Sequence, residues 1–131
     1  MVQKSVEVSP QERGEFTSVA TYLPLRRWRN VIAFIRLSMR IEEQLMKTEG
    51  VVRYGIKTDL LHKHFWTYSV WKNPESINPF VAAEPHATAV KKFAEWASEG
   101  VAFVQWKSAD GKVDWEEAAR RLKNPTYYYR K

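Results

Sequence analysis

His86 is the residue of this chain best placed to do chemistry. It follows Glu84 and Pro85 and opens a stretch with helical spacing, HATAVKKFAEW. The start of a helix favours a polar ligand, because its backbone N–H groups and dipole point outward there. A neutral imidazole in this place could orient a ligand, accept a proton or coordinate a haem iron, and Glu84 could orient the ring. A purely structural histidine that caps the helix or bonds a carbonyl group fits the sequence as well.

Aromatic side chains and one arginine are the candidate ligand-binding residues. A small-molecule pocket is mostly apolar with a few polar groups, although aromatic residues at strand and helix spacing also build ordinary cores. The arginine belongs to a cluster, RRWR, at the start of a predicted helix, where cations oppose the helix dipole and could hold a carboxylate. The set is Tyr22, Trp66, Tyr68, Phe80, Phe93, Trp96 and Arg29.

Other chemistry finds less support in the sequence. His62 and His64 form an H-x-H pair without a third ligand nearby, so we expect a solvated turn and no metal site. The chain has no cysteine, which excludes disulfides and thiolate nucleophiles. It also lacks a phosphate-binding glycine loop and a nucleophile elbow, which argues against a kinase, a dehydrogenase and a triad hydrolase.

The elements that position these residues follow from periodicity and from proline and glycine punctuation. Four stretches rich in β-formers predict strands, and two long amphipathic stretches predict helices. Their order is β-α-β-β-α-β, the split arrangement of a ferredoxin-like α+β fold with an antiparallel sheet. The predicted strands are 16–25, 51–58, 65–71 and 101–107; the helices are 27–48 and 86–98, with a short helix after Asn73 and another at 115–122.

Length and composition limit the protein's organisation. The 131 residues fit a single domain at 16–123, preceded by a flexible lead-in at 1–15 and followed by an extension at 124–131. The net charge of +6 is spread along the chain without a nucleic-acid-binding signature, so we expect no nucleic-acid partner. The start of the chain lacks the apolar run of a signal peptide, and the longest apolar stretch is broken by charges. We therefore expect a cytoplasmic protein without a membrane partner.

The predicted sheet has two apolar faces. Along 65–71, Phe65 and Trp71 share one face, whereas Trp66 and Tyr68 share the other. Helices in this topology cover one face only, so the other face needs a separate cover. A second copy of the chain would provide it and make a homodimer, which is the favoured reading. The alternative is that the C-terminal tail folds back over this face.

The stretch TYSVWKNPESINPFVAAEPHATAVKKFAEW resembles the central signature of the dimeric α/β-barrel superfamily, which includes antibiotic-biosynthesis monooxygenases. In that signature an aromatic strand ends in Trp and is followed by a short turn, a His and a helix. Within the superfamily the chain is most similar to an uncharacterised branch of small prokaryotic proteins related to spheroidene monooxygenase. The resemblance covers residues 16–122 and implies a ferredoxin-like homodimer that forms an α/β barrel, with one ligand pocket per subunit between sheet and helices.

Two functions follow as expectations. The first is a monooxygenase-like protein that binds a small hydrophobic or aromatic ligand, with His86 as the central catalytic group and haem as a candidate cofactor. The second is a non-catalytic ligand-binding or interaction protein with the same dimeric fold. A weaker third reading is a polyanion-binding protein that uses the basic surface, which predicts binding that collapses as salt rises. Fold alone does not decide among them.

Overall fold

A six-stranded antiparallel sheet organises the chain in this computed structural model, which describes residues 2–9, 15–125 and 127–128. The order across the sheet is β1-β3-β4-β2-β5-β6. The strands are β1 (Val2–Glu7), β2 (Phe16–Pro24), β3 (Val51–Asp59), β4 (His64–Trp71), β5 (Ala102–Ser108) and β6 (Tyr127–Tyr128). The helices are α1 (Val31–Met46), α2 (Ile77–Ala82), α3 (His86–Trp96) and α4 (Trp115–Leu122), with 3-10 turns η1 (Trp28–Asn30), η2 (Leu60–His62) and η3 (Pro74–Ser76).

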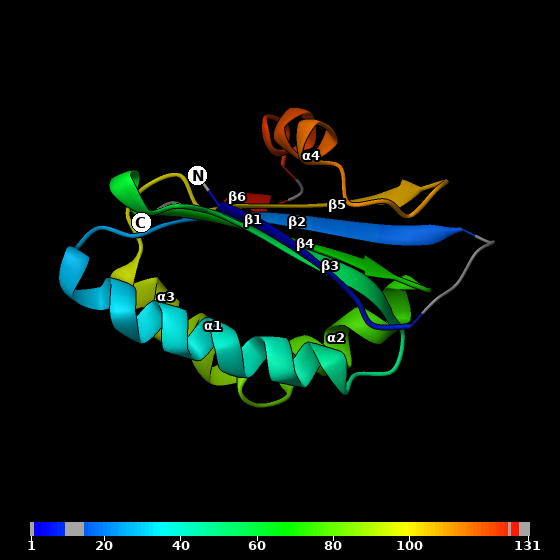
Figure 1. Cartoon of the computed structure of the whole chain (residues 1–131), viewed down its shortest axis with the longest axis horizontal. Helices are drawn as coiled ribbons and strands as arrows, with labels where there is room; N and C mark the ends of the chain where they lie inside the picture. Colours follow the sequence, from blue (N-terminus) through cyan, green and yellow to red (C-terminus); the bar gives the residue numbers. More distant parts are fainter. Residues whose placement is uncertain (1, 10–14, 126, 129–131) are drawn as a thin grey trace.

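The predicted β-α-β-β-α-β order is confirmed. It is formed by β2, α1, β3, β4, α3 and β5, and β2 and β4 pair along their length at the centre of the sheet, from Thr17 opposite Trp71 to Pro24 opposite His64. Figure 1 shows α1, α2 and α3 on one face of the sheet and α4 on the other. The fold is therefore α+β and ferredoxin-like. The sheet of the single chain is open, with β1 and β6 as its edges.

The first strand corrects the predicted lead-in. Instead of being flexible, Val2–Glu7 pairs with β3 in a register that runs from Val2 opposite Thr58 to Glu7 opposite Arg53. Two ion pairs hold it, Lys4 Nζ to Glu42 Oε2 at 2.6 Å and Arg53 Nε to Glu7 Oε1 at 2.7 Å. Charged side chains are typical of an edge strand, which explains why this segment lacks the apolar signal of a central strand. The rest of the lead-in lies outside the described residues, apart from 8, 9 and 15.

The helical face carries two apolar clusters along its length. At one end α2 packs on the sheet, and at the other end the start of α1 and the end of α3 do so. The first cluster contains the buried residues Val19, Leu45, Val51, Tyr54, Trp71, Ile77 and Phe80. The second contains Leu25, Val31, Phe34 and Phe65, with Phe93 and Trp96 packed against them. The layer formed by α1, α2 and α3 is thus packed on the sheet at both of its ends.

The helix α4 covers the centre of the opposite face. Ala118 lies in a cluster with Tyr68 and Trp106, and Trp115 and Leu122 pack against it. The helix begins at Trp115 because the Asp114 carboxylate accepts hydrogen bonds from the backbone N–H groups of Glu116 and Glu117.

The sheet leaves room for α4 at Gly55, where a Cβ atom would lie 3.0 Å from Val113 Cγ1 and 3.2 Å from Trp115 Cζ2. The helix α4, which is neither of the two covers expected for this face, therefore occupies its centre. The homodimer stays a prediction.

The neighbouring alanines Ala118 and Ala119 test this cover. Ala118 is 1 % exposed against the sheet, and Ala119 is exposed on the outer side of the same helix. We expect Ala118→Asp to lower the free energy of unfolding by about 3 kcal/mol, because it places a carboxylate against apolar residues, and Ala119→Asp to change it by less than about 0.5 kcal/mol. Urea denaturation followed by tryptophan fluorescence measures both. Equal effects at the two positions would show that α4 does not pack on the sheet.

Candidate functional site

The corner between α1, α2 and α3 is held by one side chain, Gln44. Its Nε2 donates hydrogen bonds to the carbonyl oxygens of Phe80 at 2.9 Å and Ala83 at 3.4 Å, and its Oε1 accepts one from the backbone N–H of His86 at 3.0 Å. An amide suits this place because it offers both donors and an acceptor to helix ends whose backbone groups lack partners. Sequence reasoning missed Gln44, since its partners are about forty positions away and no local pattern marks it.

The His86 imidazole is enclosed at this corner. Its ring centre lies 4.9 Å from that of Phe80, and it is hydrogen-bonded to the Val81 carbonyl group. The Nδ1 atom is buried and has no hydrogen-bonding partner among the residues that the structure describes. Burial lowers the pKa of His86 below its usual value, and the bond to Val81 opposes that change only in part. The ring is therefore mainly neutral at pH 7, and its Nδ1 is the nitrogen without a partner within the described residues.

Glu84 does not orient this ring, contrary to expectation. Its carboxylate accepts hydrogen bonds from the backbone N–H and the hydroxyl group of Thr88, four residues further along. The carboxylate thus closes the first turn of α3, where backbone N–H groups need acceptors. The orientation of His86 comes instead from Gln44 on its backbone and Val81 on its ring.

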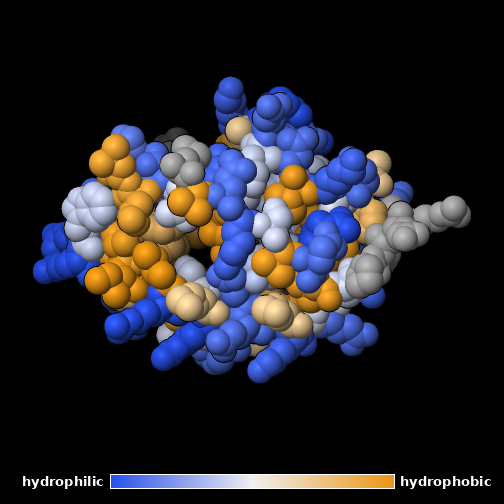
Figure 2. All heavy atoms as spheres, in the orientation of Figure 1, coloured by the Kyte–Doolittle hydropathy of each residue, from blue (hydrophilic) through white to orange (hydrophobic). Residues whose placement is uncertain are grey.

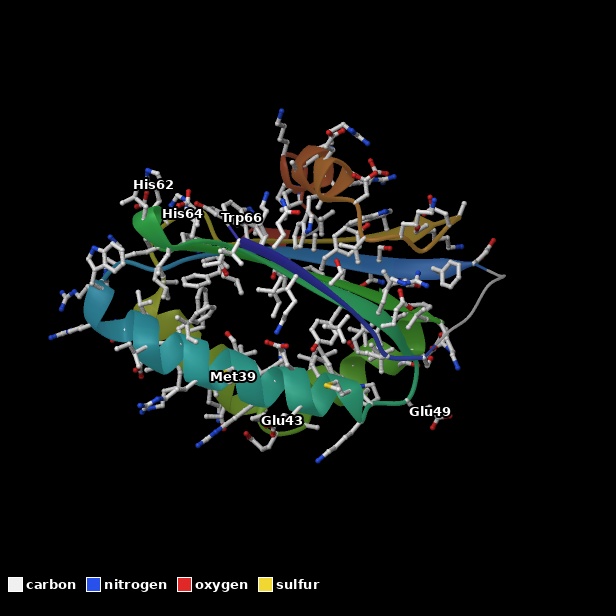
Figure 3. All side chains as sticks on the ribbon, in the orientation of Figure 1. Met39, Glu43, Glu49, His62, His64 and Trp66 are labelled. Atoms are coloured by element: carbon white, nitrogen blue, oxygen red, sulfur yellow. The ribbon has the colours of Figure 1, made fainter. Side chains whose placement is uncertain are left out.

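A groove of about 770 Å³ runs between α1 and the α2–α3 corner. Leu37, Phe80 and Pro85 give it apolar walls, whereas Arg40 and Glu43 line it with charge. Glu43 lies on the side of α1 that faces away from the sheet, as Figure 3 shows, so the groove opens on the outer surface of the helical layer. The resemblance instead implied a pocket between sheet and helices. Phe80 connects the groove with the enclosed His86 ring, because it lines the first and contacts the second.

Two predicted ligand-binding residues lie at the far end of the helical layer. Phe93 and Trp96 pack beside Phe34, whose ring centre is 5.6 Å from that of Phe93 and 4.5 Å from that of Phe65. These contacts are those of a core. The structure does not bring either residue to the groove that Phe80 lines.

Three further predicted residues lie on the opposite face of the sheet. Trp66 is seen there in Figure 3, and its ring centre lies 5.4 Å from that of Tyr22. Tyr68 is buried under α4, with ring centres 5.5 Å from Trp106 and 5.7 Å from Trp115. Burial raises the pKa of both tyrosines, so both hydroxyl groups are neutral at pH 7. The sheet separates this group from His86 and Phe80, so the predicted residues cannot line one pocket.

The remaining candidates are at one end of the molecule. Arg29 is exposed in η1, at the start of α1. His62 and His64 lie close together, with ring centres 5.9 Å apart, and His62 Nδ1 is 2.8 Å from Asp59 Oδ2. Within the described part of the chain, no group of three or more His, Asp or Glu side chains is placed to hold a metal ion.

Solved structures share this fold. The chain is similar to a protein of Nitrosomonas europaea assigned as an antibiotic biosynthesis monooxygenase, at a TM-score of 0.64 and 17 % identity, over 75 % of this chain and 92 % of that one. A conserved protein from Methanosarcina mazei matches at 0.59 and 17 % identity, over 70 % and 90 % of the two chains. SnoaB, a cofactor-independent oxygenase from Streptomyces nogalater, matches at 0.55 and 11 % identity, over 76 % and 95 %.

These likenesses establish the fold at low sequence identity. No family model matches the chain, and neither does any curated protein. The fold of the antibiotic biosynthesis monooxygenase structures, inferred from the stretch around His86, is thus confirmed. The closer relation to the branch of spheroidene monooxygenase stays a prediction.

The buried His86 predicts a pH dependence of stability. Its pKa is lower in the folded chain than the 6.5 of a free imidazole, so the unfolded chain takes up a proton first as the pH falls. The free energy of unfolding should therefore decrease below about pH 6.5 until the folded state is protonated as well. His86→Gln should reduce this slope without abolishing it, because burial also lowers the pKa of His64. Urea denaturation at several pH values measures the slope. An unchanged slope in His86→Gln would contradict the assignment.

Proposed function

We propose that the protein is a monooxygenase-like enzyme that binds a small hydrophobic or aromatic molecule at the groove beside Phe80, with His86 as proton acceptor. The observation that carries this proposal is the neutral imidazole of His86, whose buried Nδ1 has no partner within the described residues. A buried polar atom without a hydrogen bond costs free energy, and a catalytic role is one reason for which such an atom is kept. The solved structures named as monooxygenases support the reaction class through their shared fold.

The chemistry follows from the state of the ring. The neutral imidazole would accept a proton at Nδ1, the ring nitrogen that has no partner within the described residues. The ligand class that suits it has a weakly acidic C–H or O–H bond next to a flat aromatic system. Loss of that proton leaves an electron-rich anion, which can combine with dioxygen. Phe80 contacts the His86 ring and lines the groove, whereas His86 does not line it, so we expect ligand access to Nδ1 to require movement of the Phe80 ring.

Haem does not fit His86 in this arrangement. One ring nitrogen is bonded to the Val81 carbonyl group, the other is enclosed, and the His86 ring is not among the residues that line the groove. An iron ligand needs a free nitrogen directed at a cavity wide enough for the macrocycle. We expect a titration with haemin to show no Soret shift that depends on His86. A saturable shift in the wild type that His86→Ala abolishes would restore haem as the cofactor.

Oxygen consumption with an anthrone tests the enzymatic proposal. The methylene group of an anthrone is acidic, and its oxidation to a ketone consumes one dioxygen and releases water. We expect the wild type to accelerate oxygen uptake and His86→Gln to lower the rate by about 10²–10⁴-fold, the usual contribution of a general base. His62→Gln removes a histidine far from the groove and should leave the rate unchanged.

Binding without oxygen uptake would favour the alternative, a ligand-binding protein in which His86 is structural. That alternative has its own support in the structure, since the His86 ring already packs on Phe80 and bonds to Val81 as a core residue would. Retention of oxygen uptake in His86→Gln would assign the activity to another residue.

The homodimer through the sheet face remains part of the proposal in a restricted form. Because α4 covers the centre of that face, a second copy could contact only the parts beyond it, near Tyr22 and Trp66. Sedimentation equilibrium, which separates a 15.4 kDa chain from a pair, decides whether the two copies associate.

A further inference from the structure

One end of the molecule displays apolar side chains that the fold does not use. Trp28, Ile32, Leu60 and Leu61, which we name the apolar tip, are 54 %, 66 %, 49 % and 77 % exposed. The two segments that carry them are joined, because Lys63 Nζ lies 4.9 Å from the centre of the Trp28 ring and the Lys63 carbonyl oxygen accepts a hydrogen bond from Leu25 N–H at 2.9 Å. In Figure 2 hydrophobic side chains gather at the left end, where Figure 1 places η2 and the start of α1.

The two leucines are held outward by an ordered turn. Asp59 Oδ2 bonds to His62 Nδ1 at 2.8 Å, Lys63 N–H donates to the Leu60 carbonyl oxygen at 3.2 Å, and Lys63 takes a left-handed conformation at φ 59°. Tight turns between strands usually carry small polar residues, which satisfy backbone groups without exposing apolar area. The side chains of Leu60 and Leu61 cannot form hydrogen bonds with the backbone of the turn. Their exposure on a fixed turn marks a surface that meets a partner.

Positive charge borders the apolar tip. Arg26, Arg27 and Arg29 are exposed between β2 and α1, and Lys63 lies two positions after Leu61. Asp59, the acidic residue of the turn, is already bonded to His62, and that bond lowers the pKa of its carboxyl group. The surface thus combines two exposed leucines, a tryptophan and several positively charged side chains.

We propose that this end of the protein docks on an anionic lipid surface. Leu60, Leu61 and Trp28 enter the headgroup region, and the arginines contact lipid phosphates. A second copy of the chain is a poorer occupant, because a two-fold contact here would set like charges against each other. A nucleic acid would match the arginines but would leave the leucines without a role. No helix within the described ranges could span a membrane, so the contact is one of surface docking.

This proposal departs from the expectation of no membrane partner, and the reason is physical. The apolar residues are scattered along the sequence at positions 28, 32, 60 and 61, and only Ile32 belongs to the longest apolar stretch, which charged residues interrupt. The contacts of Lys63 with Trp28 and Leu25 bring the two segments to one end of the molecule.

Co-sedimentation with vesicles tests the proposal. We expect the wild type to bind vesicles of phosphatidylcholine with phosphatidylglycerol, to bind pure phosphatidylcholine far less, and to be released as salt rises. The double variant Leu60→Ser/Leu61→Ser should weaken binding by about tenfold or more through lost apolar burial. Arg27→Gln/Arg29→Gln should weaken it by about fivefold for each arginine. The matched control Met39→Ser/Met46→Ser removes two side chains of α1 that are 60 % and 57 % exposed but lie away from the tip, and should bind as the wild type does.

Three outcomes would overturn the proposal. The first is no binding of the wild type to the anionic vesicles. The second is equal weakening by the leucine and methionine variants in proteins whose circular dichroism shows them folded. The third is assignment of the surface to another partner: self-association that the leucine variant abolishes would indicate a second copy, and salt-sensitive binding of a single-stranded oligonucleotide that survives loss of the leucines would indicate a nucleic acid.

Discussion

The need to cover both faces of one sheet shapes this protein. The central strands β2 and β4 alternate so that each face receives large apolar side chains, Phe65 and Trp71 on one and Tyr68 with Val70 on the other. Apolar area of this size cannot remain in water without a large cost in free energy. The layer of α1, α2 and α3 meets that need on one side. On the other side a single short helix, α4, meets it at the centre, and Gly55 makes its close approach possible.

The sheet also separates two groups of polar and aromatic side chains. On the helical side, Gln44 satisfies the backbone groups of the α2–α3 corner and leaves the Nδ1 of His86 without a partner. On the other side, Tyr22, His64 and Trp66 contact one another through their ring edges and faces. Lys57 extends over Trp66, at 4.4 Å from the ring centre, and so closes part of this surface with its own stem. A ligand on one side has no contact with the groups on the other.

Sequence periodicity was sufficient to predict the order of the core elements. It was insufficient to predict which residues lie together in the candidate site. Strand alternation tells which residues of β4 share a face, as Trp66 and Tyr68 do, but does not tell which face the helices cover. The candidate residues were therefore grouped by their aromatic character, and the structure divides them among the corner at Phe80, the cluster at Phe93 and the opposite face. Strand β1 was missed because an edge strand held by Lys4 and Glu7 carries little apolar signal. The prediction that His86 begins a helix was confirmed, since proline before it and apolar spacing after it are local signals.

Gln44 and His86 differ in how completely their polar atoms are hydrogen-bonded. Both side chains lie at the same corner, and an amide at position 44 uses its donors and its acceptor on helix ends. A histidine at position 86 uses one nitrogen and buries the other beside Phe80 and the apolar residues around it. Stability alone would favour an apolar residue there, because it would fill the same space without an unsatisfied nitrogen. The imidazole thus leaves one polar atom unsatisfied at a position where Phe80 also lines the groove, and this pairing is the basis on which we propose His86 as a proton acceptor.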